Sequence, residues 1–303
     1  MDAAAFASRL LFAAAWLAGR LPLRTQQALG AAAGRFAHRR NLREAKVARR
    51  NLEILSAGSD PADIEQAVRT ILEHTGRNAM ETLRVWTRPR ADNLALVHRV
   101  HGLEHLEAAQ AAGRGVIVAA PHYGNWELLI EYLAARGPFS LVYRVPESRT
   151  GDAFLRLARG GENIRLVPAE ANAMRPLWKA LQAGEVVGIT PDQQPKLGGG
   201  EFAPFFGVQA LTLSLIPKLA ARSGAAVLFG YAERGPDGRF DVHFEPADPA
   251  IADADLVRAT TAMNAGVEAI ARRDLRQYQW TYKRFTLRPP ASGESSPYPR
   301  DCR

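Results

Sequence analysis

The spacing of apolar residues along the chain changes near residue 100. Before that point, Arg24 to Arg40 and Leu42 to Leu55 carry apolar residues at helical intervals, which predicts two helices. A third helix is expected to start at Pro61, directly after an aspartate, and to continue towards Trp86 before Pro89 stops it. The first hundred residues are therefore predicted to be helical.

From residue 101 onward, short apolar runs alternate with amphipathic stretches. The runs are short enough for buried strands and lie at Val116 to Ala120, Phe139 to Arg144, Ile164 to Pro168 and Val186 to Thr190. The stretches with helical spacing lie at Gly102 to Ala112, Trp126 to Arg136, Asp152 to Ala158 and Pro176 to Ala183. Buried strands separated by helices predict the α/β class, with a mostly parallel central sheet flanked by helices.

The last third of the chain adds elements of both kinds. Leu211 to Arg222 and Leu256 to Arg273 are predicted to be helices. Ala225 to Glu233 and Phe240 to Phe244 are predicted to form an antiparallel edge pair, because residues 235–238 read Gly-Pro-Asp-Gly, a turn sequence.

These patterns divide the chain into four regions. Residues 1–20 form an apolar N-terminal membrane anchor, and residues 21–100 form a helical region that packs on the core. Residues 101–288 form the α/β core. Residues 289–303 are rich in proline and serine, so we expect a loose tail.

The excess positive charge is confined to the N-terminus. Residues 1–50 hold ten basic and two acidic residues, and the other 253 residues hold 29 of each. The charge follows an apolar segment, Ala3 to Gly19, which is too short to span a bilayer comfortably and is interrupted by Ser8 and Arg9. This combination predicts an interfacial anchor whose arginines bind anionic headgroups.

Two other readings of the N-terminus are weaker. A cleaved signal peptide normally has a basic start, but Asp2 is the sole charge before Arg9. A nucleic-acid surface would interleave aromatic residues with the arginines, and Phe36 is the one aromatic residue there. We therefore expect no nucleic-acid partner.

Neither the cysteine nor the histidines suggest a metal. Cys302 is the single cysteine, which excludes a disulfide framework and a cysteine-based metal site. No pair of histidines shows the H-E-x-x-H spacing, and His101 with His105 is expected to face solvent on a helix. The expectation is therefore that no metal is bound.

The most informative stretch runs from Val116 to Glu127. A buried strand ends before His122, and a helix begins near Asn125, so the histidine lies at the carboxyl end of a strand, where α/β sheets bind ligands. If the loop folds back, Glu127 orients one ring nitrogen, and the other takes a proton from a hydroxyl. The alternative is that His122 caps a loop and Glu127 improves a helix N-terminus. No serine or cysteine occupies an elbow motif nearby.

Several motifs resemble known acyltransferases. His122-x4-Glu127 is similar to the H-x4-D/E motif of glycerolipid-type acyltransferases. Further stretches resemble the lipid A late acyltransferase family of Gram-negative bacteria, which adds secondary acyl chains to a lipid A precursor. These stretches are Arg50-Asn51-Leu52, Tyr143-Arg144, residues 179–187 followed by Pro191-Asp192-Gln193, residues 202–207 and residues 277–289.

The resemblance implies roles for five residues. His122 and Glu127 would be the catalytic pair. Arg144 and Arg159 would polarise a thioester carbonyl or bind a lipid A phosphate, the alternative for each being a surface ion pair. Asp192 follows a strand and would hold an arginine or the substrate, unless it simply forms an Asx turn with the preceding proline.

The resemblance also implies the reaction. An acyl chain would pass from the thioester of acyl carrier protein to a hydroxyl of a lipid A precursor, in lipopolysaccharide biosynthesis at the cytoplasmic face of the inner membrane, with no cofactor. The acidic carrier would dock on Arg272-Arg273 or Lys283-Arg284, unless these are only solvated charges.

Two alternatives remain. The first is a glycerol-phosphate or lysophospholipid acyltransferase, which usually has aspartate in place of Glu127 and a Glu-Gly-Thr-Arg block that this chain lacks. The second is a catalytically silent membrane scaffold.

Overall fold

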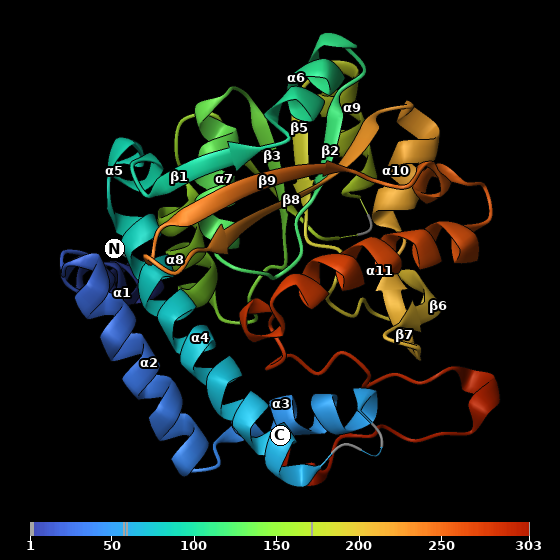
Figure 1. Cartoon of the computed structure of the whole chain (residues 1–303). Coiled ribbons are helices and arrows are strands. Elements are labelled where there is room, and N and C mark those ends of the chain that lie inside the picture. The colour runs from blue at the N-terminus through green and yellow to red at the C-terminus, as the bar shows by residue number, and fades with distance from the viewer. Residues whose placement is uncertain (1–2, 57, 59, 171, 303) are drawn as a thin grey trace.

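A seven-stranded sheet forms the centre of the molecule (Figure 1). The computed structural model describes residues 3–56, 58, 60–170 and 172–302. The strands of this sheet are β1 (Val97–His101), β2 (Val116–Ala119), β3 (Phe139–Tyr143), β4 (Ile164–Pro168), β5 (Val186–Ile189), β8 (Ala226–Arg234) and β9 (Phe240–Pro246). They lie in the order β1-β9-β8-β2-β5-β3-β4. Neighbours are parallel except β8 and β9, so the predicted mostly parallel α/β sheet is confirmed.

Helices surround the sheet and form the N-terminal region. They are α1 (Ala3–Gly19), α2 (Leu23–Arg39), α3 (Arg43–Leu55), α4 (Pro61–Thr87), α5 (Arg90–Leu94), α6 (Leu103–Ala111), α7 (Trp126–Ala135), α8 (Arg149–Arg159), α9 (Met174–Gln182), α10 (Leu215–Ser223) and α11 (Leu256–Arg273). The expected start of α4 is confirmed, since Asp60 accepts a hydrogen bond from the Ala62 backbone and Pro61 opens the first turn.

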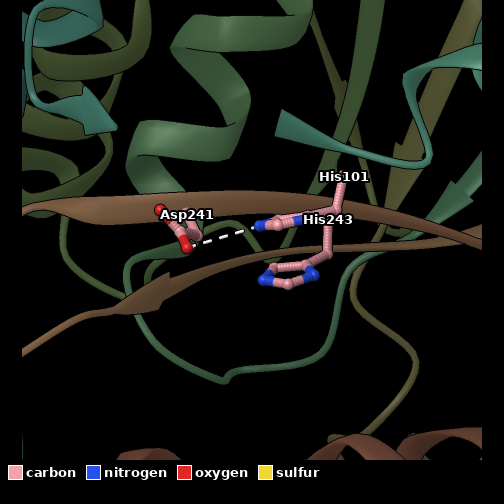
Figure 2. A group of neighbouring side chains, drawn as sticks. All are labelled: His101, Asp241 and His243. Atoms are coloured by element: carbon pink, nitrogen blue, oxygen red, sulfur yellow. Dashed lines mark hydrogen bonds and ion pairs between the residues drawn. The ribbon is translucent and has the colours of Figure 1, made fainter. Parts of the chain in front are cut away.

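Strand β1 lies in the region that the sequence predicts to be helical. It pairs in parallel with β9 at the edge of the sheet, and His101 and His243 are register partners there (Figure 2). The strand has five residues, of which only Val97 and Val100 are apolar. So short a run gives almost no alternating signal, and pairing with β9 decides its conformation.

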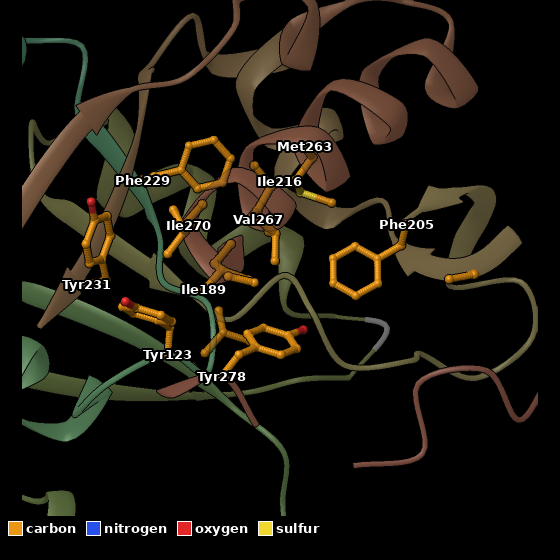
Figure 3. Close-up of a cluster of buried hydrophobic side chains, with 14 of the residues drawn as sticks. Tyr123, Ile189, Phe205, Ile216, Phe229, Tyr231, Met263, Val267, Ile270 and Tyr278 are labelled. Carbon is orange, nitrogen blue, oxygen red and sulfur yellow. The ribbon is translucent and has the colours of Figure 1, made fainter. Parts of the chain in front are cut away.

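The strand residues divide between two hydrophobic cores, one on each face of the sheet. In β2, Val116 and Val118 join the core that includes residues of α6 and α7, whereas Ile117 joins the core that includes residues of α9, α10 and α11. Figure 3 shows part of the second core, where Met263 and Val267 of α11 gather near Ile189 and Phe205. Both faces of the central strands are covered, which explains their continuous apolar runs.

A second, two-stranded sheet replaces part of a predicted helix. Strands β6 (Gly200–Phe205) and β7 (Val208–Leu213) form an antiparallel hairpin. Leu211 therefore lies in a strand, paired with Phe202, and α10 begins only at Leu215. The expected helix start at Leu211 is wrong because hairpin pairing takes the preceding residues.

The C-terminal segment is packed, although residues 289–303 were expected to form a loose tail. Tyr298 is buried and donates its hydroxyl hydrogen bond to Asn51 on α3. Arg50 Nε donates to the Pro297 carbonyl at 2.7 Å, and Cys302 is also buried. The expectation is wrong because these contacts to α3 hold a segment whose composition is typical of disorder.

The N-terminal helices carry exposed apolar side chains. In the described part of the chain, no helix has both the length and the apolar character to cross a bilayer alone. Helices α1 and α2 together have them, but the pair is bent by 114°. α1 packs against α4 and α8 and exposes five large apolar side chains: Phe6, Leu10, Leu11, Trp16 and Leu17.

A buried ion pair joins α4 to the sheet. Arg234 of β8 donates to both carboxylate oxygens of Glu81, with Nε to Oε1 at 2.7 Å. His74, about two turns earlier on α4, lies 3.3 Å from Arg234 Nη1. Burial, with the charges of Arg234 and Arg77, lowers the pKa of His74 to about 4.

We predict that this histidine makes folding stability depend on pH. Between about pH 6.5 and pH 4 the unfolded chain binds a proton at His74 that the folded chain does not. Stability should therefore fall as the pH drops through this window, by up to about 1.4 kcal/mol per pH unit. His74→Asn should give a shallower pH dependence of thermal unfolding. The exposed His105, changed in the same way, is the control, and equal slopes for wild type and His74→Asn would contradict the prediction.

Candidate active site

Two parallel strands bring His122 and Asp192 together. β2 and β5 are neighbours in register, with Ala119 paired to Ile189 at their carboxyl ends. His122 and Asp192 each lie three residues beyond that pair. Because both strands leave the sheet at the same edge, the two residues meet although 70 positions separate them.

The His122–Asp192 contact is doubled. His122 Nδ1 lies 2.7 Å from Asp192 Oδ1, and the His122 backbone N–H donates to Oδ2 at 2.8 Å. A carboxylate only accepts hydrogen bonds, so Nδ1 carries a proton and Nε2 keeps its lone pair in the neutral ring. Both residues are buried. This is the geometry of a general base with an orienting carboxylate.

Asp192 is charged despite its burial. Burial acts to raise the pKa of this carboxyl, but the charge and hydrogen bonds of His122 outweigh it, so the pKa lies below its usual value. Burial and the charge of Asp192 raise the pKa of the neighbouring Tyr278 well above its usual value, so that phenol is protonated. The carboxylate is therefore available to stabilise a protonated His122.

The free nitrogen of His122 faces two glutamines. Gln193 Nε2 lies 3.2 Å from His122 Nε2 and 3.4 Å from Gln279 Oε1. Gln279 also donates its backbone N–H to the His122 carbonyl at 3.0 Å. Trp126 packs edge-on against the ring, with centroids 4.9 Å apart. These contacts define the direction from which a proton donor approaches the ring.

Glu127 does not orient His122 as predicted. It is buried in the first turn of α7 and accepts hydrogen bonds from Trp86 Nε1 at 2.9 Å, from Trp126 Nε1 at 3.2 Å and from Arg159. Among the described residues, no hydrogen bond joins it to His122. The expected contact is therefore wrong, and Asp192 takes its place.

The backbone before α7 explains this correction. Gly124 has a φ of +58°, and a Cβ there would lie 2.0 Å from the Ala232 carbonyl oxygen of β8. The Asn125 N–H donates to that same carbonyl at 2.8 Å. The loop is therefore fixed against β8 and cannot fold back to bring Glu127 to the ring.

The two predicted arginines have different environments. Arg159 ends α8 and makes a buried, multidentate ion pair with Glu127. Burial lowers the pKa of Arg159, but the Glu127 charge and hydrogen bonds raise it more, so it lies above its usual value. Arg144 is exposed directly after β3, and its charge acts on Tyr282. Arg144 is thus the one of the two whose guanidinium is open to a substrate anion.

The C-terminal motif packs beside the site and is held there by Asn51, a residue to which the sequence assigned no role. Asn51 Nδ2 donates to the carbonyls of Trp280 and Tyr282, at 2.7 and 2.8 Å, and so holds this segment beside the site. Arg284 is buried there and donates to the Leu211 carbonyl at 2.6 Å. The family-like stretch at residues 277–289 indicated in the sequence that this segment is part of the site, but it did not show which of its side chains lie near His122.

A small cavity lies behind the pair. Its volume is about 10 Å³, close to the space that one water requires. Its lining comprises Asn51, Asp192, Gln193, Tyr278, Gln279, Trp280, Tyr282 and Arg284. Asp192 and Glu127 already bind donors, and the one group of three metal-ligating side chains found in the described residues lies elsewhere, at His101.

The fold and this site define an α/β protein with a buried histidine–aspartate pair at the carboxyl edge of a parallel sheet. Comparison with known proteins identifies the family within this class. Residues 4–286 match the family described as bacterial lipid A biosynthesis acyltransferase. The chain belongs to this family, whose activity is acyl transfer in lipid A biosynthesis.

Individual relatives cover most of the chain. A lipid A biosynthesis lauroyltransferase of Escherichia coli (strain K12) is 30% identical over 90% of this chain and 89% of its own. A lipid A biosynthesis palmitoleoyltransferase of the same strain is 29% identical over 93% and 91%. A phosphatidylinositol mannoside acyltransferase of Mycobacterium tuberculosis (strain CDC 1551 / Oshkosh) is 33% identical over 52% of this chain and 51% of its own.

We predict that the Glu127–Arg159 pair stabilises the fold. Glu127→Gln leaves a buried guanidinium without its carboxylate, which should cost roughly 3 kcal/mol of the free energy of unfolding. Adding Arg159→Met should cost much less than the sum of the single changes, because the pair is then removed together. Denaturant unfolding in detergent measures both effects.

The matched control is Glu107→Gln, which removes an exposed ion pair with Arg136. That change should cost less than about 1 kcal/mol. A Glu127→Gln protein as stable as the wild type, or strictly additive costs in the double variant, would contradict the prediction.

Proposed function

We propose that this protein transfers a fatty acyl chain from an acyl carrier protein thioester to a hydroxyl of a lipid A precursor. The observation that carries the proposal is the buried His122–Asp192 pair at the carboxyl edge of the sheet, which leaves His122 Nε2 as a proton acceptor. Such a nitrogen suits the removal of a proton from a hydroxyl. Family membership supports the acyl donor chemistry and the lipid A acceptor.

The chemical step follows from this geometry. His122 Nε2 accepts the hydroxyl proton while the hydroxyl oxygen attacks the thioester carbonyl carbon. The carbon–sulfur bond then breaks, and the imidazolium returns its proton to the leaving thiolate. Asp192 stabilises the imidazolium through Nδ1. The acceptor hydroxyl takes the position that the Gln193 amide occupies at Nε2.

Glu127 then has a positioning role in this mechanism. Its carboxylate ties the start of α7 to Arg159 at the end of α8 and to Trp86 on α4. His122 lies just before that helix, so this anchoring limits how far the imidazole can shift. We propose that Glu127 and Arg159 hold the site in place, and that Arg144 meets an anionic part of a substrate.

Docking of acyl carrier protein requires exposed basic side chains, and not all of the residues expected to dock it are exposed. Arg284 is buried, so the expectation for that residue is wrong. Arg272 binds Glu268 with Nη2 at 2.6 Å, and Arg273 binds Glu233 at 2.9 Å. We propose that the carrier contacts the C-terminal end of α11 through the guanidinium groups of Arg272 and Arg273, each of which also forms an ion pair within the protein.

We further propose that α1 attaches the protein to the cytoplasmic face of the inner membrane. Its exposed side chains Phe6, Leu10, Leu11, Trp16 and Leu17 are apolar, and the arginines of the first fifty residues are placed to attract anionic headgroups. The packing of α1 on α4 and α8 favours a helix that lies in the interface rather than a separate span.

We predict that His122→Ala reduces turnover by several orders of magnitude in a folded protein, because the base is lost. Asp192→Asn should reduce turnover about 10²- to 10⁴-fold, since an amide favours the wrong tautomer of the ring and removes the charge. The assay offers a panel of acyl carrier protein thioesters and a lipid A precursor, and the products are weighed by mass spectrometry.

The matched control for the aspartate is Asp237→Asn, which changes an exposed turn residue. Circular dichroism reports folding of every variant. Wild-type rates in a folded His122→Ala protein would exclude the mechanism. Acylation of a glycerolipid but not of the lipid A precursor would exclude the proposed acceptor while leaving the histidine in its role.

We predict that membrane attachment depends on the outward face of α1. Replacing Phe6, Leu10 and Leu17 with glutamine should move much of the protein from the membrane pellet to the supernatant, because each change removes buried apolar area from the interface.

The control replaces Leu197, Val257 and Leu275, which are equally apolar and exposed but lie away from α1. Activity in detergent should survive the α1 changes, since His122 is elsewhere. A triple variant that pellets like the wild type would contradict the prediction.

A further inference from the structure

A histidine cluster lies on the two strands at the edge of the sheet, outside the site described above. His101 of β1 and His243 of β9 are register partners, and Asp241 pairs with Arg99 two positions earlier on the same two strands. Figure 2 shows the two rings one above the other, each with a nitrogen on the side of Asp241. The ring centroids are 4.5 Å apart and the planes differ by 16°.

The ligand atoms of this cluster lie at distances that a metal ion can bridge. His101 Nε2 is 3.3 Å from Asp241 Oδ2, and one atom from each of His101, Asp241 and His243 lies within 4.8 Å of the others. Tetrahedral zinc sites have metal–ligand bonds of about 2.0–2.2 Å, which places neighbouring ligand atoms about 3.3 Å apart. The His101–Asp241 distance already has this length, and the other two distances are at most 4.8 Å.

We propose that His101, Asp241 and His243 form a binding site for a divalent transition metal of the zinc class. Two imidazoles and one carboxylate match the ligand preference of zinc, and three protein ligands leave a position for water. His101 is the most exposed of the three, with 46% of its side chain open to solvent, so an ion can enter.

Two neighbours support the ligands from behind. His98 Nδ1 lies 3.3 Å from the other carboxylate oxygen of Asp241, which suits a hydrogen bond that orients a metal-binding carboxylate. Glu233 Oε2 lies 3.7 Å from His243 Nε2 and adds negative charge, which Arg273 shares.

The site would fasten the edge of the sheet. β1 has five residues and lies at the edge of the sheet with β9 as its one neighbour there, so an ion held between the two strands adds a cross-link at that edge. Zinc should therefore stabilise the folded protein, since the ligands are brought together only on folding.

The test measures Zn²⁺ binding by calorimetry to the full chain in detergent, without a polyhistidine tag. We expect one ion per chain with micromolar or tighter affinity. His101→Asn and His243→Ala should weaken binding more than about 100-fold, and His98→Gln about tenfold, because it acts on the carboxylate and not on the ion. His38→Asn is the control, since His38 also contacts a carboxylate, that of Glu65, outside the cluster.

Two further measurements locate the ion. Zn²⁺ should raise the midpoint of thermal unfolding of the wild type but not of His101→Asn. Because position 101 is exposed, this variant is expected to fold normally. Co²⁺ should give the visible absorption of a tetrahedral site. The proposal is overturned if the wild type binds no zinc at micromolar concentration, if His101→Asn and His243→Ala bind it as well as the wild type, or if His38→Asn weakens binding equally.

Discussion

The parallel pairing of β2 with β5 is the constraint on which the site depends. It aligns Ala119 with Ile189 and sends both following loops from one edge of the sheet. The backbone N–H of Ala120 extends the ladder by one more bond to Ile189, so the loops start as a rigid pair. His122 and Asp192 inherit this alignment, which is why a carboxylate with two hydrogen bonds to one residue can be buried without a large energetic cost.

Around this pair, buried charges are compensated one by one. Glu127 is matched by Arg159, and Glu81 by Arg234, each through a multidentate ion pair. The Glu127–Arg159 pair joins α7 to α8, and the Glu81–Arg234 pair joins α4 to β8. Buried ion pairs contribute little net stability compared with apolar packing, but removing one partner is costly. They therefore make one arrangement of helices around the site much more favourable than its alternatives.

The periphery of the molecule carries the other surfaces of interest. Helix α1 leaves an apolar face open on the side of the chain that holds the excess arginines, and the sheet edge at β1 carries the histidine cluster. Glu233 links that edge to the site, because its Oε1 accepts from the Tyr123 hydroxyl at 3.0 Å while Oε2 faces His243. The proposed chemistry, membrane contact and ion binding thus use separate side chains.

Local patterns in the sequence were enough to determine much of this protein. Apolar runs predicted the central strands, and the position of His122 after one of them located the candidate site at the carboxyl edge of the sheet. The partner of His122 was decided by tertiary structure, because a strand pattern gives the end of each strand but not the order of strands in the sheet. Glu127 is close in sequence yet is held away by the Gly124 loop, whereas Asp192 is distant in sequence and meets the ring through β5. Strand β1 was not predicted because its conformation depends on tertiary pairing with β9 and not on the pattern of its own five residues.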